Sequence, residues 1–140
     1  MATVITKEIS FWSKGETDIA DITTQIQGEL DVLKVKDGIV TVFIPGSTAG
    51  VTTIEHEPGL VNDFKKMIER LIPQKINYAH DMRWHDGNGH SHIRASIIGP
   101  SLTVPFKNKK LLLGSWQQIV IIDFDNRPRS RKILLQIIGD

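Results

Sequence analysis

The sequence has no cysteine, a single tyrosine and almost no net charge. Without cysteine there is no disulfide, thiolate nucleophile or thiolate metal ligand, which fits a reducing compartment. The first residues lack the basic segment, apolar block and cleavage site of an export signal, so we expect a cytoplasmic location. Lysine and arginine total 17 against 16 acidic residues. Since single-strand binders combine a basic groove with stacking aromatics, we expect no nucleic-acid partner.

Long apolar runs are also missing. No stretch approaches the roughly 20 apolar residues that a membrane span requires, so we expect a soluble chain without a membrane partner. The composition is that of an ordinary globular protein, with 40% hydrophobic and 24% charged residues. A length of 140 residues suits one domain, and no linker or repeat divides it, so we predict a single domain over residues 1–140.

Apolar periodicity predicts an α+β domain with antiparallel or mixed sheets and about three helices. Spacings of three and four residues predict helices over 21–33, 60–71 and 88–99. β-Branched or alternating runs predict strands over 3–11, 38–44, 51–55, 101–106, 111–113, 116–124 and 132–138. We expect the strands over 38–44 and 51–55 to share a sheet. The run from Ile119 to Ile122 is apolar throughout, which indicates burial on both faces, within the chain or against another copy.

All five histidines fall in one quarter of the chain, among carboxylates. They are His56, His80, His85, His90 and His92, beside Glu55, Glu57, Asp81 and Asp86. Histidine titrates near neutrality and is the commonest nitrogen ligand of zinc, so the cluster predicts a metal or acid–base site, although each histidine alone is more often structural. In a helix over 88–99, His92 and Ser96 share one face, whereas His90 and His92 share one only in an extended chain.

Two glycine turns and a basic run are less specific. The turn Gly46–Gly50 offers free N–H groups and the hydroxyls of Ser47 and Thr48, which suit a phosphate or carboxylate as well as they suit a plain polar turn. Glu55, at the end of the following strand, is placed to face that turn. After Gly114, Trp116 is expected in the core, and Gln117 is harder to explain by packing. The basic residues from Arg127 to Lys132 are interpreted as a solvated hairpin end in preference to an anion site.

Four segments, in order and spacing, resemble the YjbQ-like family over nearly the whole chain. They are Gly46–Glu55 (GSTAGVTTIE), Tyr78–Asp81 (YAHD), Ser91–Ser96 (SHIRAS) with Gly99–Pro105 (GPSLTVP), and Gly114–Gln117 (GSWQ). The His-Ile-x-x-Ser and Gly-x-Trp-Gln elements together are more specific than either alone. The resemblance implies a compact α+β fold with a large mixed sheet and a homotrimer. It also implies a low-efficiency, secondary thiamine-phosphate synthase activity that joins a pyrimidine pyrophosphate to a thiazole phosphate.

The resemblance also implies the site residues. Catalytic roles fall to Glu55, His80, Asp81 and His92. Substrate contacts fall to Ser47, Thr48, Asn88, Ser96 and Gln117. Many bacterial members carry a histidine where this chain has Gly46, so a three-histidine site is not reproduced by simple matching; either His85 or His90 compensates or the metal is absent.

Two functions follow as alternatives. The first is a transferase acting on phosphorylated or pyrophosphorylated small molecules, in which a divalent cation, zinc or magnesium, is held by His80, His92 and His90, or in which the histidines act directly as acid and base. Asp81 then orients His80. The second is a homotrimeric metal- or small-ligand-binding protein without significant turnover. A purely structural subunit, with neither metal nor ligand, is a third.

Overall fold

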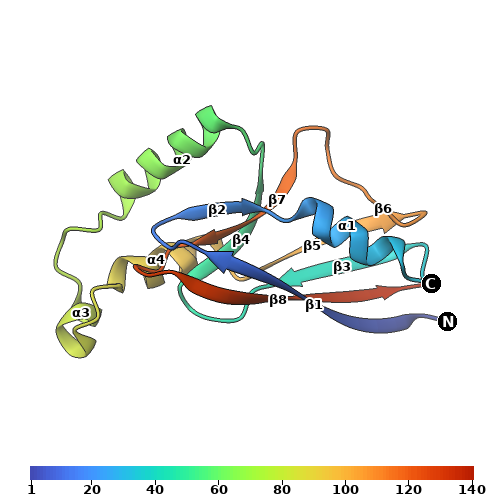
Figure 1. Ribbon diagram of the computed structural model, residues 1–140, viewed down its shortest axis with the longest axis horizontal. Coiled ribbons are helices and arrows are strands. Elements are labelled where there is room, and N and C mark those ends of the chain that lie inside the picture. Colours follow the sequence, from blue (N-terminus) through green and yellow to red (C-terminus); the bar gives the residue numbers. More distant parts are fainter.

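The computed structural model describes residues 1–140 as two antiparallel sheets and four helices (Figure 1). The five-stranded sheet has the order β1 (Thr3–Ser13), β8 (Arg129–Gly139), β3 (Gly38–Phe43), β5 (Ser101–Lys107) and β6 (Lys110–Leu111). The three-stranded sheet has the order β2 (Asp18–Asp21), β7 (Gln118–Asp123) and β4 (Ala49–Ile54). The helices are α1 (Thr23–Asp31), α2 (Pro58–Leu71), α3 (Ala79–Trp84) and α4 (Gly89–Ile98).

The main core lies between the two sheets and is closed by α1. It contains 17 buried apolar residues, among them Ile26 and Leu30 of α1 and Ile133, Leu135 and Ile137 of β8. These β8 residues alternate with outward-facing ones, as the pleat of a strand with one buried face requires. The long pairing of β1 with β8, which runs from Thr3 opposite Gly139 to Ser13 opposite Arg129, gives the molecule its length.

A second apolar cluster lies on the other face of the three-stranded sheet, under α2 and α4. It joins Ile68 of α2 and Ala95 of α4 to Val120, Ile122 and Phe124. β7 therefore sends Ile119 and Ile121 into one core and Val120 and Ile122 into the other. Burial of both faces within one chain accounts for the unbroken apolar run of this strand.

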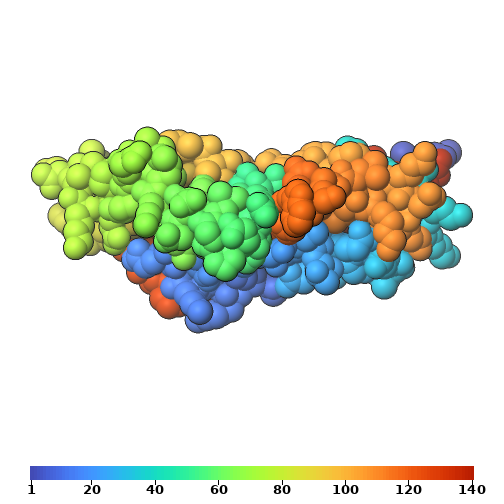
Figure 2. Space-filling model, turned by 90° about the horizontal axis from the view of Figure 1, so that it is seen from above, coloured from blue at the N-terminus to red at the C-terminus, as the bar shows by residue number.

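Helix α2 starts where β4 ends. Glu57 caps it: its carboxylate accepts hydrogen bonds from the amides of Gly59, at 2.9 Å, and Leu60. Pro58 occupies the first turn, where a missing N–H costs nothing. The helix then runs back along the sheet toward α3 (Figure 1), and Figure 2 shows it on the same face as the protruding loop 112–117. No helix is both long and apolar enough to cross a bilayer.

The α+β class and the helices predicted over 60–71 and 88–99 are confirmed, while several details are wrong. Of the two sheet types expected, antiparallel or mixed, the structure has the antiparallel one. The first helix is shorter than predicted. The strands over 38–44 and 51–55 lie in different sheets, because the turn between them carries the chain from one layer to the other. β2 and α3 were not predicted. α3 has six residues and none of them is buried, so it leaves no apolar period to detect.

The outer face of the five-stranded sheet has no helix over it and carries few charges. Two rows cross it: apolar Val4, Ile138, Ile39 and Pro105, and polar Thr6, Gln136, Thr41 and Thr103. In the polar row, Thr6 donates to Gln136 Oε1 at 2.6 Å, and the hydroxyls of Thr41 and Thr103 are 2.9 Å apart. No other element of the chain therefore covers this face.

Candidate metal centre

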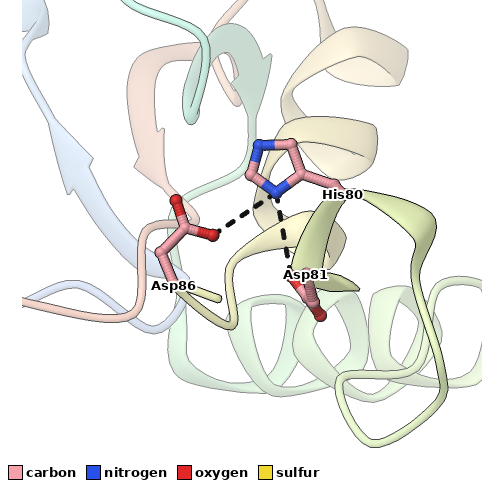
Figure 3. A group of neighbouring side chains, drawn as sticks. All are labelled: His80, Asp81 and Asp86. Atoms are coloured by element: carbon pink, nitrogen blue, oxygen red, sulfur yellow. Dashed lines mark ion pairs between the residues drawn. The ribbon is translucent and has the colours of Figure 1, made fainter. Parts of the chain in front are cut away.

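His80, Asp81 and Asp86 converge at the end of the molecule formed by α3 and α4. After α3 the chain turns through His85 and Gly87, both with left-handed φ angles of 56° and 67°, and this reversal returns Asp86 to face His80. His80 Nδ1 lies 3.4 Å from Asp86 Oδ1 and 3.7 Å from Asp81 Oδ1 (Figure 3). All three ligand atoms lie within 4.8 Å of one another. Figure 3 shows the imidazole edge directed between the two carboxylates.

The two distances from His80 Nδ1 to the carboxylate oxygens are close to those in the ligand shell of a small divalent cation. Zinc binds nitrogen and oxygen at about 2.1 Å in a tetrahedron, whose ligand–ligand edge is then about 3.4 Å. His80 Nδ1 is buried and has no hydrogen-bond partner in the protein. An unpaired buried polar atom costs about 1–3 kcal/mol, a penalty that coordination of a cation between ring and carboxylates removes. The geometry therefore suits a metal with two carboxylates and one imidazole as ligands.

His92 lies beside this group. Its ring centroid is 4.3 Å from that of His80, and the ring planes are inclined by 41°. Burial lowers the pKa of His92, and the neighbouring His80 lowers it further. The neutral form of His92 is therefore favoured near pH 7, which leaves a ring nitrogen free to accept a proton or to ligate a metal.

His90 lies apart from this group. In helix α4, residues two positions apart point to nearly opposite sides. His90 therefore points into the interior, whereas His92 faces α3. His90 is fully buried, its ring is 6.5 Å from that of Tyr78, and its Nδ1 has no hydrogen-bond partner. Burial lowers its pKa, with a further contribution from Arg94. The expectation that His90 joins the metal ligands is not met, because that stretch is helical and not extended.

Asp81 and Asn88 hold the loop that carries Asp86. Asp81 Oδ1 accepts a hydrogen bond from the Gly89 amide at 2.8 Å, at the start of α4. The side chain of Asn88 gives no cap bond to α4; its amide lies between the carboxylates of Asp86 and Asp125. The side-chain amide of Asn126 donates a hydrogen bond to the backbone carbonyl of Asp86 at 2.8 Å. Asn88 thus joins the metal-centre residues to a second polar cluster.

That second cluster is buried and internally paired. Arg131 binds Asp123 through two hydrogen bonds of 2.8 and 2.9 Å and donates to Thr48 Oγ1 at 2.7 Å. Thr48 in turn donates to Asp125 at 3.2 Å, and Arg129 reaches Asp125 at 2.8 Å. Burial alone would raise the pKa of Asp125, but hydrogen bonds from Arg129, the Asn126 amide, Asn88 and Thr48 lower it below its ordinary value.

The interpretation of the basic run as a solvated hairpin end is therefore wrong for Arg131, whose side chain is only 5% exposed. The signal was present in the sequence. Side chains alternate between the two faces of a strand, so Arg131 points to the same side as Ile133, Leu135 and Ile137, which form the inward face of β8. The preceding Asp123 and Asp125 also flank a buried strand end, where a charge requires a partner.

Ser47 and Ser96 come together at a surface hollow of about 230 Å³ between the Gly46–Ala49 turn and α4. Its other lining residues are Gly46, Ala49, Ala95 and Pro100. Ser96 Oγ donates to the carbonyl of His92 at 2.8 Å, so the hollow adjoins the turn of α4 that carries His92. Thr48 points away from it, into the cluster of Arg131 and Asp125.

Glu55 and Gln117 lie at the opposite end of the three-stranded sheet. The six residues of β4 separate Glu55 from Thr48, about 20 Å at ~3.3 Å per residue, so Glu55 does not face the Gly46–Gly50 turn. Gln117 donates to Thr53 Oγ1 at 3.2 Å and accepts from the Gly114 amide at 3.0 Å. Trp116 is 74% exposed, so its expected place in the core is wrong. Within one chain Glu55 and Gln117 therefore lie far from His80 and His92.

Comparisons with known proteins point to one family. The family described as UPF0047 protein YjbQ-like matches residues 7–140. A UPF0047 protein of Methanocaldococcus jannaschii is 39% identical over 88% of this chain and 86% of its own length. The crystal structure of a protein of unknown function from Sulfolobus solfataricus, described as YbjQ-like, is similar with a TM-score of 0.94 and 28% identity over 100% of both chains. A family member from Clostridium acetobutylicum is similar with a TM-score of 0.85 and 34% identity over 94% of this chain and 98% of its own.

Proposed function

This chain belongs to the YjbQ-like (UPF0047) family, and we propose that it is a divalent-metal-dependent enzyme acting on a phosphorylated small molecule. The observation that carries the proposal is the buried Nδ1 of His80, which lacks a hydrogen-bond partner and lies 3.4 and 3.7 Å from two carboxylate oxygens. Three protein ligands leave one position for water or substrate, the arrangement typical of catalytic rather than structural zinc.

A divalent cation held by His80, Asp81 and Asp86 would supply positive charge that stabilises an oxyanion or a departing phosphate and would lower the pKa of a bound water. His92 is the nearest neutral base, because burial lowers its pKa. Asp81 accepts a hydrogen bond from the start of α4 and lies beside His80 of α3, so it would hold α3 and α4 together around a bound cation.

The hollow beside α4 supplies the substrate contacts. Ser47 and Ser96 both line it, and its volume of about 230 Å³ suits a phosphate group with part of its carrier. The transfer that joins a pyrimidine pyrophosphate to a thiazole phosphate is the reaction to test first, since the cation would stabilise charge on the departing pyrophosphate.

The test uses EDTA-treated, untagged protein reloaded with zinc or magnesium. We expect thiamine phosphate to form with the parent and the rate to fall at least ~100-fold in His80→Ala, about the loss expected when a metal ligand or its orienting partner is removed. His56→Ala, outside the centre, serves as the matched control and should retain the parent rate. Equal rates in the parent and in His80→Ala would rule out catalysis at this centre.

A structural metal is the second candidate, and α3 is the observation that favours it. None of the six residues of α3 is buried, so little apolar packing holds this helix to α4. An ion on His80, Asp81 and Asp86 would fix α3 and the following turn in place of a core. This candidate predicts stoichiometric metal and a raised Tm without turnover on pyrophosphorylated substrates.

A further inference from the structure

Arg131 of β8 is a buried cation whose hydrogen-bond donors are only partly used. Its side chain is 5% exposed. A guanidinium carries five N–H donors. Here Nε and Nη2 make three hydrogen bonds, two to Asp123 and one to Thr48, and Nη1 donates to nothing in the chain. The side-chain atoms sealed from solvent without a partner are two histidine nitrogens, so Nη1 is not sealed and reaches the surface.

Gly46 provides the opening above this nitrogen. A Cβ atom at position 46 would lie 2.9 Å from Arg131 Nη1, closer than real Cβ contacts come. The φ angle of 108° also favours glycine at this position. Gly46 lines the hollow of about 230 Å³ between the turn and α4, together with Ser47 and Ser96. The missing side chain therefore leaves Nη1 accessible from this hollow.

The turn itself adds further donors. The amides of Gly46, Ser47 and Thr48 donate to no backbone carbonyl, and the exposed Ser47 carries a hydroxyl. A carboxylate offers two oxygens to such a set of donors, whereas a phosphate group offers three and carries more charge. Successive backbone amides and a guanidinium are both groups that bind phosphate in proteins. The set of free donors therefore favours a phosphate group over a carboxylate.

Negative charge beside Arg131 opposes an anion, but the carboxylates of its own cluster are already paired. Asp123 occupies the Nε–Nη2 edge of the guanidinium. Asp125 comes no closer than 3.9 Å, at Nη2, and is paired with Arg129 at 2.8 Å. The two guanidinium groups thus balance the two carboxylates, and neither carboxylate bonds Nη1.

The carboxylates of the metal centre also act against an anion in the metal-free chain. The Asn88 amide lies between Asp86 and Asp125, so the negative charge of the centre is close to the Arg131 cluster. Asp81 and Asp86 have only His80 as an ionic partner. A divalent cation at the centre would offset their charge, so phosphate should bind more tightly to metal-loaded than to metal-free protein.

We propose that Arg131 Nη1 and the amides of the turn Gly46–Thr48 form a phosphate subsite, in which the buried guanidinium contacts the ligand through the opening at Gly46. Arg131 then has two roles, since its Nε–Nη2 edge holds Asp123 while Nη1 binds the ligand. Ser96 Oγ donates to the His92 carbonyl at 2.8 Å, so the subsite adjoins the turn of α4 beside the metal centre. That the phosphate belongs to a substrate rests on the proposed function, whereas phosphate binding itself requires neither metal nor turnover.

An NMR titration of inorganic phosphate into isotope-labelled, EDTA-treated protein tests the subsite. The amide signals of Gly46, Ser47 and Thr48 should shift to saturation, and sodium chloride of equal ionic strength should not shift them. Gly46→Ala places a methyl group against Nη1 and should weaken phosphate binding at least ~10-fold. Gly28→Ala is the matched control, because a Cβ atom at position 28 meets nothing within 4 Å, and it should keep the parent affinity.

Arg131→Lys is the second variant and decides the question if Gly46→Ala does not fold. Lysine keeps a positive charge for Asp123 but has no second amino group, so the affinity should again fall at least ~10-fold. An absence of saturable shifts in the parent, or parent affinity in either folded variant, overturns the subsite. Phosphate binding without zinc uptake removes the metal centre and leaves the subsite, whereas zinc uptake without phosphate binding removes the subsite and leaves the centre.

Discussion

Two polar clusters lie next to each other at the α3 end of the molecule, and they differ in how well their atoms are paired. In the first, Arg131, Asp123 and Asp125 form a buried network with a hydrogen bond on each charged group. In the second, His80 Nδ1 faces two carboxylates without a hydrogen bond of its own. A fully paired cluster stabilises the fold, whereas an unpaired one at the surface is available for a ligand.

The largest expected effect is a loss of stability when the paired cluster around Arg131 is broken. Arg131→Met leaves the Asp123 carboxylate buried without its bidentate partner, and breaking such a pair from one side costs about 3–5 kcal/mol. Denaturant unfolding of metal-free protein measures this loss. The exposed Arg127→Met is the control and should stay within ~0.5 kcal/mol of the parent. A loss under ~1 kcal/mol for Arg131→Met would mean that the network contributes little.

Adjacent residues of one turn sharpen the comparison. Thr48→Val removes the hydroxyl that accepts from Arg131 and donates to Asp125, so two buried charges each lose a partner, at about 1–3 kcal/mol. Ser47→Ala, which alters only the exposed hollow, should leave the free energy of unfolding within ~0.5 kcal/mol while weakening binding of a phosphorylated ligand. The reverse pattern would exchange the roles assigned to the two hydroxyls.

A smaller effect concerns pH. Burial lowers the pKa of His90 and of His92, so between the ordinary histidine value of 6.5 and the lower folded value the unfolded chain binds more protons than the folded one. Stability contributed by the neutral rings is therefore complete above pH 6.5 and is lost as the pH falls below it. Unfolding curves at pH 7.5 and 5.5 measure the difference, which should shrink in His90→Asn and persist in His56→Asn. A flat profile in the parent would contradict the assigned burial.

The smallest effect on stability is expected at Asp81. Asp81→Asn keeps an oxygen that accepts from the Gly89 amide, so the free energy of unfolding should change by less than ~0.5 kcal/mol, whereas Asp81→Ala should lose about 1 kcal/mol. Both variants remove a carboxylate from the centre, so both should bind zinc more weakly than the parent, as calorimetric titration measures. Equal affinity in all three proteins would remove Asp81 from the ligand set.

Periodicity predicted those elements whose burial follows a simple pattern. The apolar face of α2 and the alternation of β8 lie in the sequence itself, and the apolar run of β7 correctly indicated burial on both faces. α3 was not predictable in this way, because it buries nothing and depends on His85 and Gly87 to end it. The partition of β3 and β4 between two sheets depends on the path of the turn between them, which residue types alone do not define.

The sequence indicated which segment of the chain carries the site, but not which side chains come together in it. Clustering in sequence indicated His80, Asp81 and His92, and the reversal after α3 brings Asp86 beside His80 and Asp81 as a further candidate ligand. The burial of Arg131 was missed because runs of charged residues are usually solvated. Its position in the alternating pattern of β8 nevertheless places its side chain on the inward face. Glu55 and Gln117 were assigned to the same pocket by resemblance, and the extended path of β4 places them at the far end.

Calorimetric titration of zinc into EDTA-treated parent and Asp86→Asn tests the contrast between the clusters most directly. The Asp86 side chain is 47% exposed and asparagine has the same shape as aspartate, so Asp86→Asn should change the free energy of unfolding by less than ~0.5 kcal/mol. We expect one ion per chain in the parent and an affinity at least ~100-fold lower in the variant. No binding to the parent, or equal binding to both proteins, would contradict the assignment of His80, Asp81 and Asp86 as a metal centre.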